Sequence, residues 1–289
     1  MRPRTQGVLL VNLAVLFFGF PGVIGKVLPL SPVQLTWLRV FLASLGLLVV
    51  LLIQKVKPQV PGHGPRLLLL AAGFLLAFHW TAFFRAVQVS TVAVGLLSYS
   101  TFPVFTVFLE PWLLRTKFRR SYLYFAVLCF LGVGLMVPEF SLSNRIFQGV
   151  VWGILSGLSF ALLAIINRML SPGHSSLVLA FYQDSLAMIF LLPLFLSQPG
   201  PLPLGTVNAG LILFLGLVCT AGAHTIFIRG LRFIEARLSS LISSLEPVYG
   251  IIFGYLFLGE LPGFRTVAGG LLILASVVII SWKSPGLGS

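Results

Sequence analysis

A few ionisable side chains stand inside long apolar runs of this sequence, where a charge is costly and needs a role. They are Arg39, His79, Asp184, His224 and Glu246. A charged side chain at the centre of a bilayer costs about 2.5–3.5 kcal/mol on insertion scales. At about 1.5 Å of helix rise per residue, the first two lie about 12 Å below the outer surface, and the other three lie about 9–12 Å from the inner one. The spacing therefore predicts two layers of polar groups.

The inner layer is suited to a protonation switch. If Asp184 and Glu246 lie close together, both carboxylates cannot ionise at low cost, so one would hold a proton near neutral pH. His224 could exchange that proton, because imidazole titrates in the physiological range. The alternative is that Asp184 and Glu246 make separate structural hydrogen bonds between helices. Both interpretations remain open, and these three residues are the candidates for proton coupling.

Arg39 has two possible roles. Its planar guanidinium matches the carboxylate of a small ligand. Alternatively, it extends toward the surface or pairs with a carboxylate of a facing helix, although Asp184 sits about 6 Å deeper on the estimate from helix rise. The structural role is slightly favoured.

Aromatic and hydroxyl side chains within the runs are further candidates. Ser240, Ser243, Ser244 and Pro247 follow i, i+3, i+4, i+7 spacing and therefore share one helix face. Packing against lipid or between helices is the alternative for each candidate. The candidate cavity residues are Trp37, Arg39, His79, Trp80, Phe83, Ser98, Tyr99, Tyr182, His224, Ser240, Ser243 and Ser244.

Two prolines stand in the middle of apolar runs. Pro103 and Pro247 each free a backbone carbonyl and permit a helix to bend. They are therefore predicted hinges or gates.

The elements that carry these residues must be membrane-spanning helices. Hydrophobic residues make up 58% of the 289 residues, charged residues only 9%, and the mean hydropathy is +1.06. A soluble domain carries roughly 25% charged residues. Barrel strands would alternate apolar and polar residues, whereas these runs are unbroken over about 20 residues, the length of a spanning helix. The predicted spans are 6–27, 31–53, 67–87, 91–113, 121–137, 147–169, 176–197, 207–230, 237–258 and 264–282.

The distribution of Lys and Arg predicts the orientation. With the N-terminus inside, the outer set of loops holds only Lys26, Arg85, Arg145 and Arg265, and the remaining basic residues at span ends are cytoplasmic. Both termini are then cytoplasmic, and a bacterial inner membrane is expected. The net charge of +13 is explained by contacts with lipid headgroups, not by nucleic acid. Cys129 and Cys219 lie inside apolar runs and are expected to be inert packing residues.

An internal repeat relates the two halves. Arg85 and Arg229 are separated by the same interval as Pro103 and Pro247, and Lys26 matches Arg168 at a similar shift. We therefore predict two repeats, residues 1–140 and 147–285. Five spans are an odd number, so the two repeats are inverted relative to each other, an arrangement found in secondary transporters. A repeat that only builds a scaffold is the alternative.

The stretch Ser244-Leu245-Glu246-Pro247-Val248-Tyr249-Gly250, followed by Phe257-Leu258-Gly259-Glu260, resembles the EamA-type branch of the drug/metabolite transporter superfamily. Pro103 looks like the first-half counterpart of Pro247. The first half departs from the pattern, because Arg115-Thr116 stands where Gly-Glu would fall, which leaves Glu260 without a symmetric partner.

The resemblance covers nearly the whole chain and implies ten helices, a central cavity and transport of small metabolites such as amino acids, with export expected. It also gives more weight to Trp80, Phe83 and Tyr99, because the third and fourth spans line the cavity in that family. The sequence contains no nucleotide-binding loop or zinc-helix motif, so a gradient must drive transport. No catalytic residue, cofactor or metal is expected, and a monomer is plausible. A channel or lipid flippase is the alternative, and a membrane-embedded enzyme the more remote one.

Overall fold

The structure is a computed structural model of the chain. It describes residues 3–59, 63–115, 122–170, 174–198, 202, 205–231, 233–234, 242–243 and 245–283. These residues form helices and connecting turns, and no strand occurs among them. The prediction of an all-α membrane protein is confirmed.

The first half contains seven helical segments. They are α1 (Pro3–Phe18), α2 (Phe20–Val27), α3 (Pro32–Ile53), α4 (His63–Val89), α5 (Val92–Tyr99), α6 (Phe102–Leu114) and α7 (Tyr122–Met136). The second half contains α8 (Arg145–Leu170), α9 (Ser176–Leu196), α10 (Thr206–Leu213), the π-helical segment η1 (Phe214–Gly222), α11 (Ala223–Leu231), α13 (Glu246–Leu258) and α14 (Phe264–Lys283).

These segments agree with the predicted spans to within a few residues. Within the described ranges, 7 helices or consecutive helix pairs are long and apolar enough to cross a membrane, and Leu123–Met136, Glu246–Leu258 and Phe264–Ile279 are shorter apolar helices. The predicted ninth span, 237–258, lies partly outside the described residues. The count of ten spans therefore stays a prediction.

Local sequence signals set several helix boundaries. Ser31 caps α3 in a reciprocal pair with Gln34, and Pro32 occupies the first turn, where its missing N–H is harmless. The Thr91 hydroxyl accepts the backbone N–H of Val94 at the start of α5.

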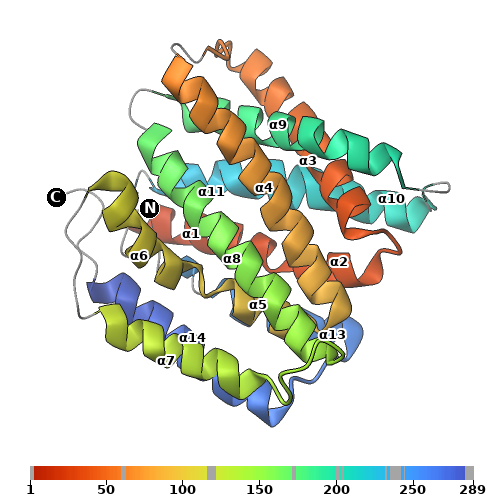
Figure 1. Ribbon diagram of the computed structural model, residues 1–289. Coiled ribbons are helices and arrows are strands. Elements are labelled where there is room, and N and C mark those ends of the chain that lie inside the picture. Colours follow the sequence, from red (N-terminus) through yellow and green to blue (C-terminus); the bar gives the residue numbers. More distant parts are fainter. Residues whose placement is uncertain are drawn as a thin grey trace.

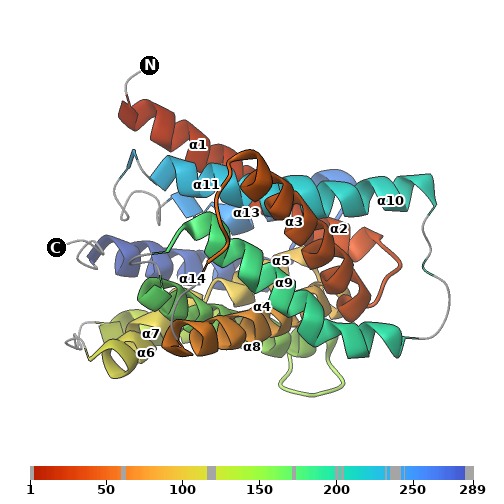
Figure 2. The same ribbon diagram turned by 90° about the horizontal axis from the view of Figure 1, so that it is seen from above.

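The helices pack in reciprocal pairs between the two halves. Helix α4 packs on α8, and α1 packs on α11. Helices α3 and α9 pack together along the upper edge of Figure 1, while α7 and α14 pack together along the lower edge. The start of α1 and the end of α14 lie on the same side of the molecule in both Figure 1 and Figure 2.

Glycines permit the closest of these contacts. Gly149, Gly153 and Gly157 form one stripe on α8. A Cβ atom at Gly153 would lie 2.5 Å from the Cβ of Ser98, and one at Gly157 would lie 2.8 Å from the carbonyl oxygen of Tyr99. Small residues at such spacing let membrane helices approach closely, so α8 holds α4 and α5 against the centre of the molecule.

Each candidate hinge proline lies in the first turn of a helix that follows a break. Helix α5 ends at Tyr99, and α6 begins at Phe102 with Pro103 in its first turn. Helix α13 begins at Glu246 with Pro247 in its first turn. The fourth span is therefore discontinuous near its middle, a feature of helices that build transporter sites.

Candidate functional site

The guanidinium of Arg39, on α3, contacts side chains of α4 and η1. The Arg39 side chain is 1% exposed. Its Cζ atom lies 3.2 Å from the centroid of the Trp80 ring and 5.9 Å from that of Phe84. Such a contact is worth about 2 kcal/mol when it is desolvated. Trp80 on α4 therefore covers one face of the cation carried by α3.

One side chain of the second half also holds Arg39. Its Nε donates a hydrogen bond of 2.7 Å to the hydroxyl of Thr220. Thr220 lies in η1 and donates in turn to the carbonyl oxygen of Leu215, also at 2.7 Å. A π-helical segment inside a helix often marks a functional site. The contact joins the two halves of the chain at the arginine.

The remaining hydrogen-bonding capacity of Arg39 is not used fully. Its Nη1 atom is buried and has no hydrogen-bond partner. Asp184 and Glu246 both interact electrostatically with the guanidinium. Neither carboxylate forms a hydrogen bond or ion pair with a residue in the described part of the chain. Each carboxylate therefore lies within electrostatic range of the guanidinium without a direct contact to it.

The electrostatic reach of Arg39 also joins the two polar layers expected from depth. Its charge acts on His79 of the outer layer and on His224 of the inner layer. Arg39 therefore lies within electrostatic range of members of both layers.

His79 fastens α4 to α8. Its ring Nδ1 lies 3.0 Å from the carbonyl oxygen of Ser156 and 2.9 Å from the Ser156 hydroxyl. The same hydroxyl donates to the backbone carbonyl of His79 at 3.1 Å. The side chain is 2% exposed, so the structure places His79 in an interhelical contact beside the Arg39 site.

An aromatic cluster surrounds His79. The ring centroid of His79 lies 4.8 Å from Trp80, 5.2 Å from Tyr99 and 5.0 Å from Phe160. Phe83 is 2% exposed and contacts Trp80 edge-on at 5.7 Å. The candidates Arg39, His79, Trp80, Phe83 and Tyr99 are therefore brought together.

Trp37 and Tyr182 lie apart from this cluster. Trp37 donates its ring N–H to the carbonyl oxygen of Met188 at 3.1 Å and stacks on Phe195 at 4.2 Å, so it packs α3 on α9. Tyr182 donates its hydroxyl hydrogen to the carbonyl oxygen of Pro58 at 2.7 Å. It borders a cavity of about 650 Å³ near the start of α4.

The hydroxyl candidates divide into three cases. Ser98 is fully buried, and its hydroxyl has no hydrogen-bond partner. Ser243 is partly buried. Ser240 and Ser244 lie outside the described residues.

The side chain of His224 is exposed. His224 lies in the first turn of α11, which follows η1 on the same span as Thr220.

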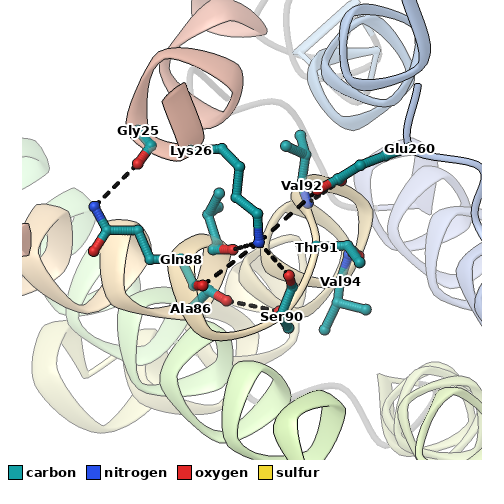
Figure 3. A network of polar contacts seen from close by, with 10 residues as sticks. Gly25, Lys26, Ala86, Gln88, Ser90, Thr91, Val92, Val94 and Glu260 are labelled. Carbon is teal, nitrogen blue, oxygen red and sulfur yellow. Dashed lines mark hydrogen bonds and ion pairs between the residues drawn. The ribbon is translucent and has the colours of Figure 1, made fainter. Parts of the chain in front are cut away.

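A polar network closes one end of the fourth span, where α5 begins (Figure 3). The ammonium of Lys26 lies 3.9 Å from the carboxylate of Glu260. It also donates to the carbonyl oxygens of Ser90 and, at 3.0 Å, Val87, at the end of α4. Glu260 accepts the backbone N–H of Val92 at 2.8 Å, in the first turn of α5. The network therefore ties α2, α4, α5 and the end of α13 together.

A second ion pair closes the other end of the same span. Arg168, in the last turn of α8, pairs with Glu110 of α6. Val92 and Glu110 are separated by about 27 Å at the rise of an α-helix. Glu110 is not among the candidates predicted from the sequence, although the chain has only 6 acidic residues and this one lies inside an apolar run.

Glu110 is the counterpart of Glu260 in the first half, where the sequence has no Gly-Glu. Glu260 has no symmetric partner in sequence, but Glu110 pairs with Arg168, which is the residue that matches Lys26. Glu110 lies earlier in the first half than Thr116, the position that aligns with Glu260, so an alignment of the two halves does not identify it.

No group of His, Cys, Asp and Glu residues suited to hold a metal ion occurs among the described residues. Cys129 and Cys219 are buried free thiols. Arg85 and Arg229 are exposed.

The chain matches known proteins over nearly its whole length. Residues 5–137 and residues 147–282 each match the EamA-like transporter family. A Bacillus subtilis (strain 168) protein named as an uncharacterized transporter, YxxF, is 24% identical over 99% of this chain and 92% of its own length. The pseudopaline exporter CntI of Pseudomonas aeruginosa (strain UCBPP-PA14) is 25% identical over 85% of this chain and 86% of its own.

More distant similarities agree with this assignment. The S-adenosylmethionine uptake transporter of Rickettsia prowazekii (strain Madrid E) is 22% identical over 73% of this chain and 70% of its own. A solved crystal structure with 16% identity has the same fold, with a TM-score of 0.66 and coverage of 94% of both chains.

Proposed function

Because the chain belongs to the EamA-like transporter family, we propose that it is a secondary transporter that exports a small amino-acid-like metabolite by alternating access. The chain is an integral membrane protein, and its relatives are named as transporters rather than enzymes. The pseudopaline exporter and the S-adenosylmethionine uptake transporter are named for different solutes and for opposite directions of transport. The solute and the direction of transport therefore belong to the proposal.

The proposal treats residues 1–140 and 147–285 as two inverted repeats. Two observations support it. The family matches the chain twice, once in each half. The packing is also reciprocal, because α4 contacts α8 while α1 contacts α11. Two related halves of similar energy can exchange conformations, which opens a central site to each side in turn.

The observation that carries the mechanism is the pair of ion pairs at opposite ends of the fourth span. Lys26–Glu260 joins the helices at one end, and Arg168–Glu110 joins them at the other. Arg39, on the second span, is fully buried. In alternating access each pair opens when its own end faces water, while the other stays closed.

Closure at both ends distinguishes a transporter from the alternative functions, a channel or an enzyme. A channel needs a continuous path, whereas in this proposal the two ion pairs close the path alternately, one at each end. An enzyme would need converging catalytic groups, whereas His79 is engaged with Ser156.

Asp184, Glu246 and His224 remain the candidates for proton coupling. In this proposal, one carboxylate exchanges a proton with the solvent as the site changes sides. Pro103 and Pro247 remain the hinge candidates, since each follows a helix break. The expected location is a bacterial inner membrane with both termini cytoplasmic, and a monomer is sufficient.

Counterflow in proteoliposomes tests this function. Vesicles containing the purified protein are loaded with each of a panel of labelled amino acids, nucleosides, vitamins and sugars, and exchange against external solute is recorded. A carrier exchanges labelled solute in a saturable way and only in the presence of external solute. Dissipation without exchange would indicate a channel, and chemical modification of the solute would indicate an enzyme.

A proton gradient imposed across the same vesicles tests the coupling. Net transport that accelerates with the gradient supports the assignment of Asp184, Glu246 and His224. Equal rates with and without the gradient would remove that assignment while leaving transport itself intact.

A further inference from the structure

A cavity of about 650 Å³ lies between three helices that pack against one another, α3, α4 and α9. Its volume falls within the range of about 300–1,000 Å³ that is usual for ligand pockets. Arg66 and Leu70 of α4 and Leu186 of α9 line it, together with Pro58 of the loop that follows α3. Tyr182 donates its hydroxyl hydrogen to the carbonyl oxygen of Pro58 at 2.7 Å, so this loop is held against α9 at the edge of the cavity.

One end of the cavity is cationic. Arg66 contributes a positive charge to the lining, and the described residues that line the cavity include no acidic one. Lys57 directly precedes Pro58 in the loop, and both Lys55 and Lys57 are exposed. The corresponding loop of the second half, residues 198–205, contains no basic residue. The positive charge is therefore a property of this loop and this cavity, and it is not repeated in the other half.

The backbone at Lys55 indicates that its charge has a role. Lys55 has a φ of 53° and lies just beyond the end of α3, where its N–H donates to the carbonyl oxygen of Leu52 at 3.1 Å and that of Val56 donates to Leu51 at 3.0 Å. Glycine is the usual residue at this position of a helix end, because a side chain is strained there. A lysine at Gln54 would complement the dipole of α3 without that strain. The position of the cation therefore points to a contact outside the helix itself.

Arg66 lies at the level of the lipid headgroups. Helix α4 has 27 residues and is about 40 Å long, which exceeds the ~30 Å hydrocarbon core of a bilayer. Arg66 occupies its first turn, next to the charged loop that follows α3. The cationic end of the cavity therefore lies at the membrane surface.

The face of α4 that carries Arg66 continues as an apolar surface toward the middle of the bilayer. Arg66, Leu70 and Phe74 follow i, i+4, i+8 spacing and share this face. Leu70 is 43% exposed and Phe74 56% exposed, and the Phe74 ring packs edge-on against Phe190 of α9 at 5.9 Å. At 1.5 Å of rise per residue, the face extends about 12 Å from Arg66 to Phe74. A charged end at headgroup level and an apolar path below it match a phospholipid and not a soluble anion.

We propose that this cavity binds one anionic phospholipid, with its phosphate on Arg66 and an acyl chain along Leu70 and Phe74. The planar guanidinium matches two phosphate oxygens. Basic pockets between the ends of membrane helices bind such headgroups. Because no acidic residue lines the cavity, the ammonium group of a zwitterionic headgroup finds no counter-ion there, and a net negative headgroup is favoured. The inference goes beyond the proposed transport function and does not depend on it.

Thermal unfolding of the full chain in a neutral detergent tests the choice of lipid. Phosphatidylglycerol, phosphatidylcholine with the same acyl chains, and inorganic phosphate are each titrated into the purified protein. A ligand that binds the folded state raises the unfolding midpoint in a saturable way. Phosphatidylglycerol should do so, phosphatidylcholine should need at least about fivefold more lipid for the same shift, and inorganic phosphate should have no effect.

Variants of the cationic end test the contact with the headgroup. Arg66→Gln should weaken phosphatidylglycerol about fivefold, the effect of one basic residue near an anionic headgroup, and should leave phosphatidylcholine unchanged. Arg66→Lys keeps the charge and should retain most of the binding. Arg265→Gln is the matched control, because Arg265 is also an exposed arginine in the first turn of an apolar helix, α14, and does not line the cavity. It should bind phosphatidylglycerol as the wild type does.

Variants of the apolar end test whether the lipid occupies the cavity. Leu70→Trp fills part of the cavity and should weaken phosphatidylglycerol several-fold. Leu67→Trp is its control, because Leu67 is 66% exposed on the same helix and does not line the cavity. The lipid-free midpoint of each variant is its own reference, so a loss of stability is separated from a loss of binding.

Four results would each overturn the inference. They are equal binding of phosphatidylcholine and phosphatidylglycerol, equal protection by inorganic phosphate, normal binding by Arg66→Gln, and normal binding by Leu70→Trp. None of them bears on counterflow, so the lipid site and the transport function stand or fall separately.

Discussion

Lys26 and Glu260 approach to 3.9 Å across the ends of α2 and α13, and each also satisfies the end of another helix. Lys26 donates to carbonyl oxygens at the end of α4, while Glu260 accepts an N–H at the start of α5. Cations at helix C-termini and anions at N-termini both complement the helix dipole. One ion pair therefore connects four helices, α2, α4, α5 and α13. Its loss should weaken the packing of all four at this end of the molecule.

Breaking either terminal ion pair should open the corresponding end. Glu260→Gln removes the partner of Lys26, and Glu110→Gln removes that of Arg168. In a Cys129→Ser background, the buried thiol of Cys219 should react several-fold faster with a charged maleimide. For Glu260→Gln the reagent should act from the Lys26 side, and for Glu110→Gln from the opposite side. Glu139→Gln, at an exposed loop position, is the control and should change nothing. Equal acceleration from one side by both variants would contradict a two-ended closure.

Arg85 and Arg229 should lie on opposite sides of the membrane. Both are exposed and occupy corresponding positions of the two halves, so an inverted repeat turns one outward and the other inward. Arg85→Cys and Arg229→Cys should each be labelled by an impermeant thiol reagent from one side only, and the sides should differ. The native cysteines are buried and provide a low background. Labelling of both from the same side would refute the inverted arrangement.

Replacing the hinge prolines should change turnover more than insertion. Pro103→Ala restores an N–H that can bond to the carbonyl oxygen of Tyr99, which would join α5 and α6 into a straighter helix. The half-saturation concentration should change little, while the maximal exchange rate should fall several-fold. Pro247→Ala should act in the same direction at α13. Unchanged rates with normal amounts of protein in the membrane would show that neither proline is a hinge.

The glycine stripe of α8 should tolerate no side chain. Gly153→Ala places a Cβ 2.5 Å from that of Ser98, and such overpacking costs about 1–3 kcal/mol. Gly134→Ala is the matched control, because Gly134 also lies inside a helix but a Cβ there meets nothing within 4 Å. The control should be neutral or stabilised by up to about 1 kcal/mol, since alanine is the better helix former. Unfolding midpoints in detergent compare the two, and a Gly153→Ala variant as stable as the control would show that α8 and α5 can separate at no cost.

The positions of the helices could be predicted from the lengths of the apolar runs and from the proline, glycine and charged residues between them. Apolar runs of spanning length, separated by proline, glycine and charge, predicted segments that match the observed helices closely. The breaks also followed, since Pro103 and Pro247 stand where new helices begin. These features depend on local chemistry, because lipid requires each segment to satisfy its own backbone hydrogen bonds.

The interaction partners of the charged residues could not be predicted from the sequence in the same way. Depth alone separated Arg39 from Asp184 and Glu246, and an alignment of the two halves left Glu260 without a counterpart. The structure brings the first three into electrostatic range and pairs Glu110 with Arg168. It also engages Trp37 with Met188 on a different face from Trp80.

The sequence by itself therefore determined that this is a helical membrane protein, roughly where its spans begin and end, and which polar groups are too costly to be incidental. Only the tertiary structure decided which of those groups meet. The reason is physical: a helix face turns by 100° with each residue, so a contact between two spans depends on rotation, tilt and local π-helical or broken geometry. These are set by the packing of all the helices together, and the sequence of one span does not contain them.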